Sequence, residues 1–435
     1  MGDKSSLEKL ETAARPAVVV VFDVEDPIPT LLYDGIHREA WVVARVARQP
    51  RAMRVVDLAS GVQVQRAQLH EMVEQCALLP VTTTRPVDDE SLPFITVVVP
   101  TIAQRSEELD ACLRSLSLQS YPHFEIILID NRRTVPSLDV LSDITTRWPR
   151  LTFLRERVPG ISAARNRGIA HARGEVIAFT DDDVEVAENW LMTIGSEFAR
   201  HREIDVVTGL ILPAELETPA QLWFEMYYGG FAGERIFEAL TVQATRRHSS
   251  RIEACGDDGD VVRTVALYGA GAFGAGANMA FRASAIATLG GFDQALGTGT
   301  ISRGGEDLAA LMGILWSGGR IRYQPHAYVW HRHRRSYAEL LTQLDGYGIG
   351  FTAALTSLVM RDPRHLLAIV RNGPLALREL VRNLRVNLRG RGRAAGATSA
   401  VREFPSEMAG REYRGYLRGP GAYVRSLREI RKRID

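Results

Sequence analysis

Three consecutive aspartates, Asp181, Asp182 and Asp183, directly follow the short apolar run 176–179. An apolar run of this length between polar flanks predicts a buried strand, so the aspartates should lie at its C-terminal end. Side chains alternate along an extended chain, and Asp181 and Asp183 can therefore point to one side while Asp182 points elsewhere. Two carboxylates at a strand end offer the hard oxygen ligands that Mg²⁺ or Mn²⁺ prefers, and such a cation holds phosphate oxygens. Taken alone, the triplet can also be a solvated acidic turn.

Two other pairs of side chains stand at the ends of predicted elements. Glu306 and Asp307 follow a glycine-rich segment and open a helix whose apolar residues recur with helical spacing over 308–316. His331 and His333 close a predicted strand and, being two residues apart, lie on one face of it. Each pair also has an ordinary structural interpretation, a favourable first-turn charge for the acids and a basic edge for the histidines.

The segment 269–276 contains four glycines and is followed closely by Asn278. Glycine permits close backbone approach, so this segment predicts either a loop that contacts a ligand or a flexible surface loop. It is not a Walker A loop, because no Gly-Lys-Ser/Thr follows.

Alternating strands and helices from Phe94 onward predict an α/β fold with a mostly parallel sheet flanked by helices. In such sheets ligands bind at the C-terminal ends of the strands, the edge where the three aspartates are expected. Asp130 closes another predicted strand and falls at the same edge. We expect strands at 94–100, 125–130 and 151–156, and helices at 107–119 and 162–174.

The regions on either side have a different character. Residues 1–92 predict a small β-rich module and linker, with strands at 17–24, 41–47 and 52–58 and a helix at 65–79. Residues 93–345 form the predicted α/β domain, and 346–435 a helical, Arg-rich region. The basic end suits either an anionic membrane surface or packing on an acidic catalytic domain, and both interpretations stay open.

The composition is that of an ordinary folded protein of 435 residues with a formal net charge of +1, which gives no global indication of nucleic-acid binding. Three cysteines far apart, Cys76, Cys112 and Cys255, predict neither a metal site nor a disulfide framework and suit a reducing compartment. The N-terminus lacks the pattern of a signal peptide and no apolar run reaches about 20 residues. We therefore expect a cytoplasmic protein, soluble or peripheral on the inner face of the membrane.

The order of these motifs along the chain is more specific than any one of them. Pro-Thr and Asp-Asn at two strand ends, then Ala-Arg-Asn-Arg-Gly, the aspartates, Gly-Glu-Asp and His-Arg-His follow one another over residues 94–345. This succession resembles the family 2 glycosyltransferases, nucleotide-sugar enzymes of the GT-A (Rossmann-like) fold. The resemblance implies an inverting, metal-dependent transfer of a sugar from a nucleotide-diphosphate donor to an acceptor hydroxyl. The donor base, the sugar, the acceptor (glycan, lipid, peptide or natural product) and the oligomeric state stay open.

The resemblance also implies roles for particular residues. Asp183 would bind the metal ion, Mn²⁺ or Mg²⁺, with His331 or His333 as a further ligand. Asp307 would be the catalytic base, and Glu306 is the second candidate for it. The donor-binding residues that the resemblance implies are Pro100 and Thr101 beside the nucleotide, Asp130 at the base, Arg165, Asp181 near the ribose, and Asp182. The sequence departs from the commonest form of the family after Thr101, where Ile-Ala-Gln stands, so contacts from this loop are not implied.

Two other functions use similar residues. A nucleotidyltransferase acting on sugar phosphates also pairs aspartates with a metal ion, but it usually has a glycine-rich basic loop after the first strand, which residues 100–108 do not supply. A non-catalytic nucleotide- or sugar-binding module of the same fold is the third interpretation, and the intact acids and histidines argue against it.

Overall fold

The computed structural model describes residues 14–78, 87–134, 141, 144–148, 151–231, 235–371, 391–392, 402–403 and 405–434. The predicted linker in part, over 79–86, and the Arg-rich stretch 372–390 lie outside the described residues. Within the described part, no helix combines the length and apolarity needed to cross a membrane.

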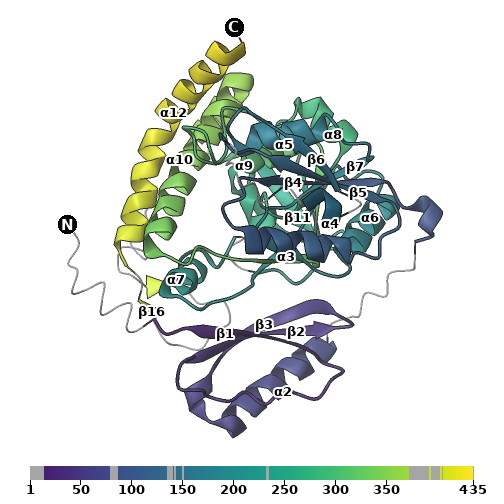
Figure 1. Ribbon diagram of the computed structural model, residues 1–435, viewed down its shortest axis with the longest axis vertical. Helices are drawn as coiled ribbons and strands as arrows, with labels where there is room; N and C mark the ends of the chain where they lie inside the picture. The colour runs from purple at the N-terminus through teal and green to yellow at the C-terminus, as the bar shows by residue number, and fades with distance from the viewer. Residues whose placement is uncertain are drawn as a thin grey trace.

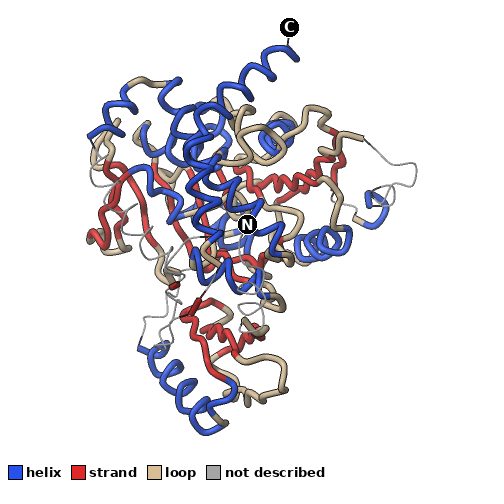
Figure 2. The backbone as a smooth tube through the Cα atoms, turned by 90° about the vertical axis from the view of Figure 1, so that its left-hand side faces the viewer, coloured by secondary structure: helices blue, strands red, loops and turns tan. Residues whose placement is uncertain are grey.

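A large mixed sheet forms the centre of the molecule (Figures 1 and 2). Its strand order is β12-β11-β10-β14-β9-β13-β7-β4-β5-β6, with β8 paired to β14. Strands β6, β5, β4 and β7 are parallel, β13 is antiparallel, and β9 and β14 are parallel to each other. Antiparallel hairpins β10–β12 extend one end of the sheet. The strands are β4 (Ile95–Thr101), β5 (Phe124–Asp130), β6 (Leu151–Arg155), β7 (Val176–Phe179), β8 (Val184–Val186), β9 (Val206–Pro213), β10 (Leu240–Ala244), β11 (Arg251–Cys255), β12 (Val261–Ala266), β13 (Met279–Arg282) and β14 (Arg320–His331).

Helices cover both faces of this sheet, as the continuous apolar strands require. In β5, Ile126 and Leu128 belong to the core on one face, while Ile127 and Ile129 belong to the core on the other. Each such side chain contributes roughly 1.5–3 kcal/mol by leaving water. The first face is covered by α3 (Ser106–Ser117), α4 (Ile144–Arg147) and α6 (Trp190–Arg200), the second by α5 (Ile161–Ile169), α8 (Ala283–Leu289) and α9 (Glu306–Trp316).

The N-terminal residues form a separate three-stranded sheet, at the end of the molecule far from the C-terminus in Figure 1. It consists of β1 (Ala17–Asp23), β2 (Glu39–Val46) and β3 (Gln49–Asp57), followed by α2 (Val62–Leu78). Alternate residues of β2 face opposite ways: Val42 packs with α2, whereas Trp41 packs with α7 (Pro219–Tyr228). The strands and the helix predicted for this region are therefore present, and the sheet is buried on both faces.

Two long helices, α10 (Tyr337–Arg361) and α12 (Glu407–Ile434), run side by side in the same direction (Figure 1). Glycines bring their backbones together. A Cβ on Gly348 would lie 2.1 Å from the carbonyl oxygen of Glu412, and one on Gly415 would lie 2.8 Å from that of Asp345. Hydrogen bonding joins them as well, because Thr352 Oγ1 donates to the carbonyl of Tyr416 at 2.9 Å.

The helix predicted over 162–174 ends five residues early, at Ile169. Tertiary hydrogen bonds explain the difference. The backbone N–H of Arg173 donates to Glu125 at 3.0 Å, and that of Gly174 donates to Thr96 Oγ1 at 2.9 Å. These bonds hold the chain against β4 and β5 in place of a further helical turn. Short elements complete the described fold: η1 (Leu58–Ser60), η2 (Asp89–Ser91), η3 (Leu267–Phe273), β15 (Arg391–Gly392) and β16 (Arg402–Glu403).

Candidate active site

The three aspartates follow β7 at the edge where the parallel strands end, as expected from the sequence. Strand β8 begins directly after them and pairs with the end of β14, so that Val184 lies opposite His331. The backbone N–H of Arg332 also donates to the carbonyl of Asp183 at 3.0 Å. This pairing brings the acids and the late histidine together, although about 150 residues separate them along the chain.

Asp181, Asp183 and His331 form a group that could hold a metal ion. One ligand atom from each of them lies within 4.8 Å of the others, and His331 Nε2 is 3.4 Å from Asp183 Oδ1. Burial lowers the pKa of His331 to about 4, so its imidazole is neutral and keeps a lone pair for a metal. Its buried Nδ1 has no hydrogen-bond partner among the described residues. Two carboxylates and a neutral imidazole suit Mn²⁺ or Mg²⁺.

The two histidines lie in different environments, although their rings are only 5.3 Å apart. His333 Nε2 is 2.7 Å from a carboxylate oxygen of the fully buried Glu225 on α7. Burial opposes ionisation of Glu225, but Arg235 and His333 together lower its pKa to about 2. His333 is thus engaged in a buried ion-pair group, and the geometry favours His331 over His333 as the ligand.

Asp182 points away from the other two aspartates, toward β4. Its carboxylate accepts a hydrogen bond from Thr101 Oγ1 at 2.5 Å, and the same hydroxyl accepts from the backbone N–H of Ala103 at 2.9 Å. Burial and the charge of Asp183 raise the pKa of Asp182 to about 7. Asp182 therefore links the end of β7 to the loop after β4.

Arg165, on α5, joins three segments from the centre of the site. Its guanidinium, which is 1% exposed, donates to Asp181 at 3.1 Å, to Glu306 at 2.8 Å and to the carbonyl of Gly276 at 3.1 Å. A Cβ on Gly276 would come within 2.8 Å of this guanidinium and 3.3 Å of Asp307, so only glycine fits without displacement. The glycine-rich segment is thus held against the site and lines its cavity.

Glu306 and Asp307 open α9 but face different surroundings. Glu306 is buried against Arg165, and burial together with the charge of Asp307 raises its pKa to about 7, with Arg165 opposing the shift. Asp307 is half-buried, and its two oxygens accept from the backbone N–H groups of Gly276 at 2.8 Å and Leu308 at 2.7 Å. Of the two acids, Asp307 is the one without a salt bridge to Arg165.

Asp130 lies at the end of β5 and is 1% exposed. Its carboxylate accepts from the side chain of Arg132 at 2.8 Å and from the backbone N–H of the same residue at 3.0 Å. The neighbouring Asn131 and Arg132 line the cavity described next, whereas Asp130 is turned toward Arg132.

A cavity of about 1610 Å³ connects the predicted site residues. Its walls include Pro100, Thr101, Arg165, the three aspartates, Glu306, Asp307 and His331. Helices α10 and α12 also contribute to the walls, and several of the lining residues are aromatic. The aromatic residues in the lining are Phe231, Tyr268, Tyr347, Phe351 and Tyr416.

Several residues at the site were missed by the sequence analysis. Arg105 approaches Asp183 at 3.3 Å and Arg334 approaches it at 3.9 Å, so two guanidiniums border the acidic group. Little in the sequence indicated either arginine, because Arg105 stands in a loop without a motif and Arg334 in a run of basic residues. The aromatic rings of α10 and α12 had no sequence signal, since their helices approach the site only in three dimensions.

Comparison with known proteins is consistent with this arrangement. Residues 96–238 match the family described as glycosyl transferase family 2. The chain is 27% identical over 181 residues to glycosyltransferase AglE of Haloferax volcanii, covering 41% of this chain and 53% of that protein. It is 26% identical over 242 residues to the pre-mycofactocin glycosyltransferase of Mycobacterium tuberculosis, covering 56% and 43% of the two chains. The matches thus span about half, or less, of these relatives.

Among solved structures, the chain is similar to a mannosyltransferase from Pyrobaculum calidifontis in complex with GDP-Man and Mn²⁺. The TM-score is 0.43 and the identity 16%, covering 83% of this chain and 93% of that one.

Proposed function

We propose that the chain, whose residues 96–238 match glycosyl transferase family 2, transfers a sugar from a nucleotide-diphosphate donor to an acceptor hydroxyl with inversion. The observation that carries the proposal is the convergence of Asp181, Asp183 and His331 on one cavity that Asp307 also lines. A site of this kind has separate groups for the leaving diphosphate and for the attacking hydroxyl.

The residues at the end of β7 would hold a divalent cation. Asp181, Asp183 and His331 are the proposed ligands, and the fit rests on their spacing and on the neutral imidazole of His331, whose Nε2 lies 3.4 Å from Asp183 Oδ1. A bound Mn²⁺ or Mg²⁺ would supply charge stabilisation at the diphosphate oxygens. Arg105 and Arg334 stand where they can contact phosphate oxygens as well, because both guanidiniums already lie beside Asp183.

Asp307 is the proposed base that takes the proton of the acceptor hydroxyl. Two backbone N–H bonds hold its carboxylate in place, and its remaining lone pairs are free to accept from a substrate. Glu306 is tied to Arg165 and is proposed to position the start of α9. One base and one displacement, without a second carboxylate acting as a nucleophile, give inversion at the anomeric carbon, by analogy with inverting hydrolases.

The aromatic wall would bind the acceptor. Tyr347 and Phe351 on α10 and Tyr416 on α12 line the cavity. Aromatic rings with a polar edge suit a partly apolar, hydroxyl-bearing acceptor. We propose that these two helices set acceptor preference.

The exposed side of α12 is the proposed contact with an anionic membrane surface. Its buried side packs on α10, while Leu417 is 87% exposed among basic residues. Such a face suits the headgroup region of anionic lipids. Within the described part of α12, the exposed basic residues that would make this contact include Arg411, Arg414, Arg431 and Lys432. Sedimentation with anionic vesicles should decline at high salt, and equal binding to neutral vesicles would contradict the contact.

Slow hydrolysis of a nucleotide sugar in the absence of acceptor tests the main proposal. A thermal-shift panel of UDP-, GDP- and TDP-sugars with Mn²⁺ first identifies the donor, since a ligand that binds only the folded state raises Tm. Hydrolysis of that donor should stop with a chelator and with Asp183→Asn, while Asp205→Asn, an acid outside the cavity, serves as the control. Metal-independent turnover, or full activity in Asp183→Asn, would contradict the proposed site.

A further inference from the structure

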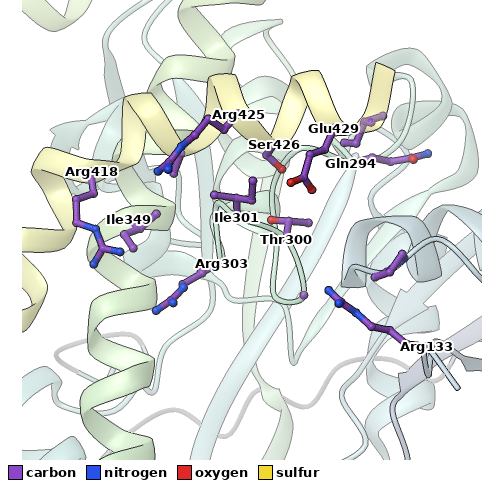
Figure 3. A pocket seen from close by; sticks show the side chains of 14 residues that line it. Arg133, Gln294, Thr300, Ile301, Arg303, Ile349, Arg418, Arg425, Ser426 and Glu429 are labelled. Atoms are coloured by element: carbon purple, nitrogen blue, oxygen red, sulfur yellow. The ribbon is translucent and has the colours of Figure 1, made fainter. Parts of the chain in front are cut away.

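A second cavity, of about 640 Å³, adjoins the site and is rich in arginine. It shares Arg133, Thr300 and Arg303 with the larger cavity, so the two are continuous along the loop that leads into α9. Figure 3 shows Arg418 and Arg425 of α12 together with Arg303 and Arg133, arranged around Thr300 and Ile301. Arg133 lies within residues 96–238, whereas α12 and the loop that carries Thr300 and Arg303 lie beyond the family match.

The arginines are only partly neutralised. Arg303 and Arg418 share one carboxylate, that of Asp345, at 2.8 and 3.0 Å. Among the described residues Glu429 is the acid in the lining, so four guanidiniums face the two carboxylates of Asp345 and Glu429, an excess of two positive charges within that part of the chain. Arg425 donates to the carbonyl of Gly421 on its own helix at 3.2 Å, which leaves its positive charge in place.

The remaining polar groups suit a tetrahedral oxyanion. Thr300 and Ser426 contribute hydroxyls and Gln294 an amide, and all three can donate to an anionic oxygen. Guanidiniums bind phosphate through paired, charge-assisted hydrogen bonds, which are stronger than neutral ones. The chemistry of the lining is therefore that of a phosphate site.

The donor does not need this second site. A nucleotide-diphosphate sugar carries its charge on one diphosphate, which the aspartate end of the larger cavity would hold with a cation. Resting on the function proposed above, we infer that the arginine cavity binds a phosphate or diphosphate group carried by the acceptor. The acceptor would then lie with its hydroxyl at Asp307 and its anionic group against α12.

Phosphate binding by the full-length chain tests this inference. Thermal shift with inorganic phosphate, in a chelator and against sodium chloride of equal ionic strength, measures binding without donor or metal. Arg425→Gln should weaken this binding about tenfold, the effect of losing one charge-assisted hydrogen bond. Arg428→Gln removes an equal charge three residues away, outside the lining, and should leave the affinity unchanged.

A second arm distinguishes a soluble acceptor from a lipid-linked one. Vesicles of phosphatidylcholine with phosphatidic acid present the same phosphate chemistry on a membrane. A lipid-linked group predicts that Arg425→Gln lowers vesicle binding more than Arg428→Gln does, whereas a soluble one predicts equal losses and a response to inorganic phosphate alone. If neither probe distinguishes the two variants, the inference is wrong.

Asp183→Asn separates this inference from the proposed function. This variant should lose donor hydrolysis and keep the phosphate response of the wild type. A phosphate response that disappears with Asp183→Asn and persists in Arg425→Gln would overturn the second site while leaving the donor site intact. A parallel loss of donor affinity in Arg425→Gln would overturn the assignment to the acceptor.

Discussion

Replacement of Arg165 by methionine should destabilise the protein in a pH-dependent way. The substitution keeps the apolar stem and removes a guanidinium that is 1% exposed and bonded to Glu306 and Asp181. Breaking a buried ion pair by removing one partner costs about 3–5 kcal/mol, because a charge stays buried without compensation. For 435 residues, an unfolding entropy of roughly 2.1 cal/mol/K per residue converts this loss into about 3–5 °C of Tm.

The sign of the pH dependence follows from Glu306. Its pKa is raised from 4.5 to about 7 in the folded protein, so the folded state binds the proton more tightly than the unfolded state does. The associated stability is fully present below pH 4.5 and is lost as pH rises through about 7. Without Arg165 the carboxyl loses the cation that opposes the shift, and its pKa should rise further. The loss in Arg165→Met should therefore be larger near about pH 8 than near about pH 6.

Urea denaturation at the two pH values measures both effects. Arg167→Met, an exposed arginine on the same helix, is the matched control and should change stability by less than about 0.5 kcal/mol. Arg165→Met combined with Glu306→Gln should recover part of the loss, because the uncompensated charge is gone. Equal stability of Arg165→Met and Arg167→Met, or a loss that does not depend on pH, would refute the reasoning.

Three further predictions concern the base, the metal ligand and the helix pair. Asp307→Asn should lower the transfer rate about 10²–10⁴-fold while equilibrium donor binding is retained, and a wild-type rate would refute its role. His331→Ala should raise the metal concentration needed for donor hydrolysis about 10–100-fold. His333→Ala should instead lower Tm through the loss of its buried partner, and the reverse pattern would exchange their roles. Gly348→Ala, whose Cβ would meet an α12 carbonyl at 2.1 Å, should cost about 1–3 kcal/mol in urea denaturation, whereas Gly410→Ala, in open space on α12, should not.

The sequence was informative where chemistry follows a strand or opens a helix. The aspartates at 181–183 could be placed because the end of an apolar run marks the end of a buried strand, and parallel strands end at one edge of the sheet. Asp307 could be placed because apolar residues with helical spacing begin directly after it. Arg165 was found by resemblance alone. Its three hydrogen-bond partners lie on separate segments of the chain, so no local sequence pattern could have shown that Arg165 connects them.

The choice between His331 and His333 could not be made from the sequence. Alternation along a strand places both on one face, and what separates them is Glu225 on α7. That helix lies in 214–265, where periodicity was uninformative because the segment mixes a capped helix with half-exposed hairpins. The arginine cavity was equally hidden, since it depends on α12 packing alongside α10.

The glycine contacts between α10 and α12 limit how the cavity can change shape. Side-chain interfaces adjust by switching rotamers, but a carbonyl that already meets a Cα has no such freedom. The two helices should therefore move together as one rigid unit. We expect any widening of the cavity for a bulkier acceptor to come from a change in the connection between His331 and α10. To widen the range of acceptors, Tyr416 or Phe351, which line the cavity, should accordingly be replaced by smaller residues. The glycines between α10 and α12 should be left unchanged.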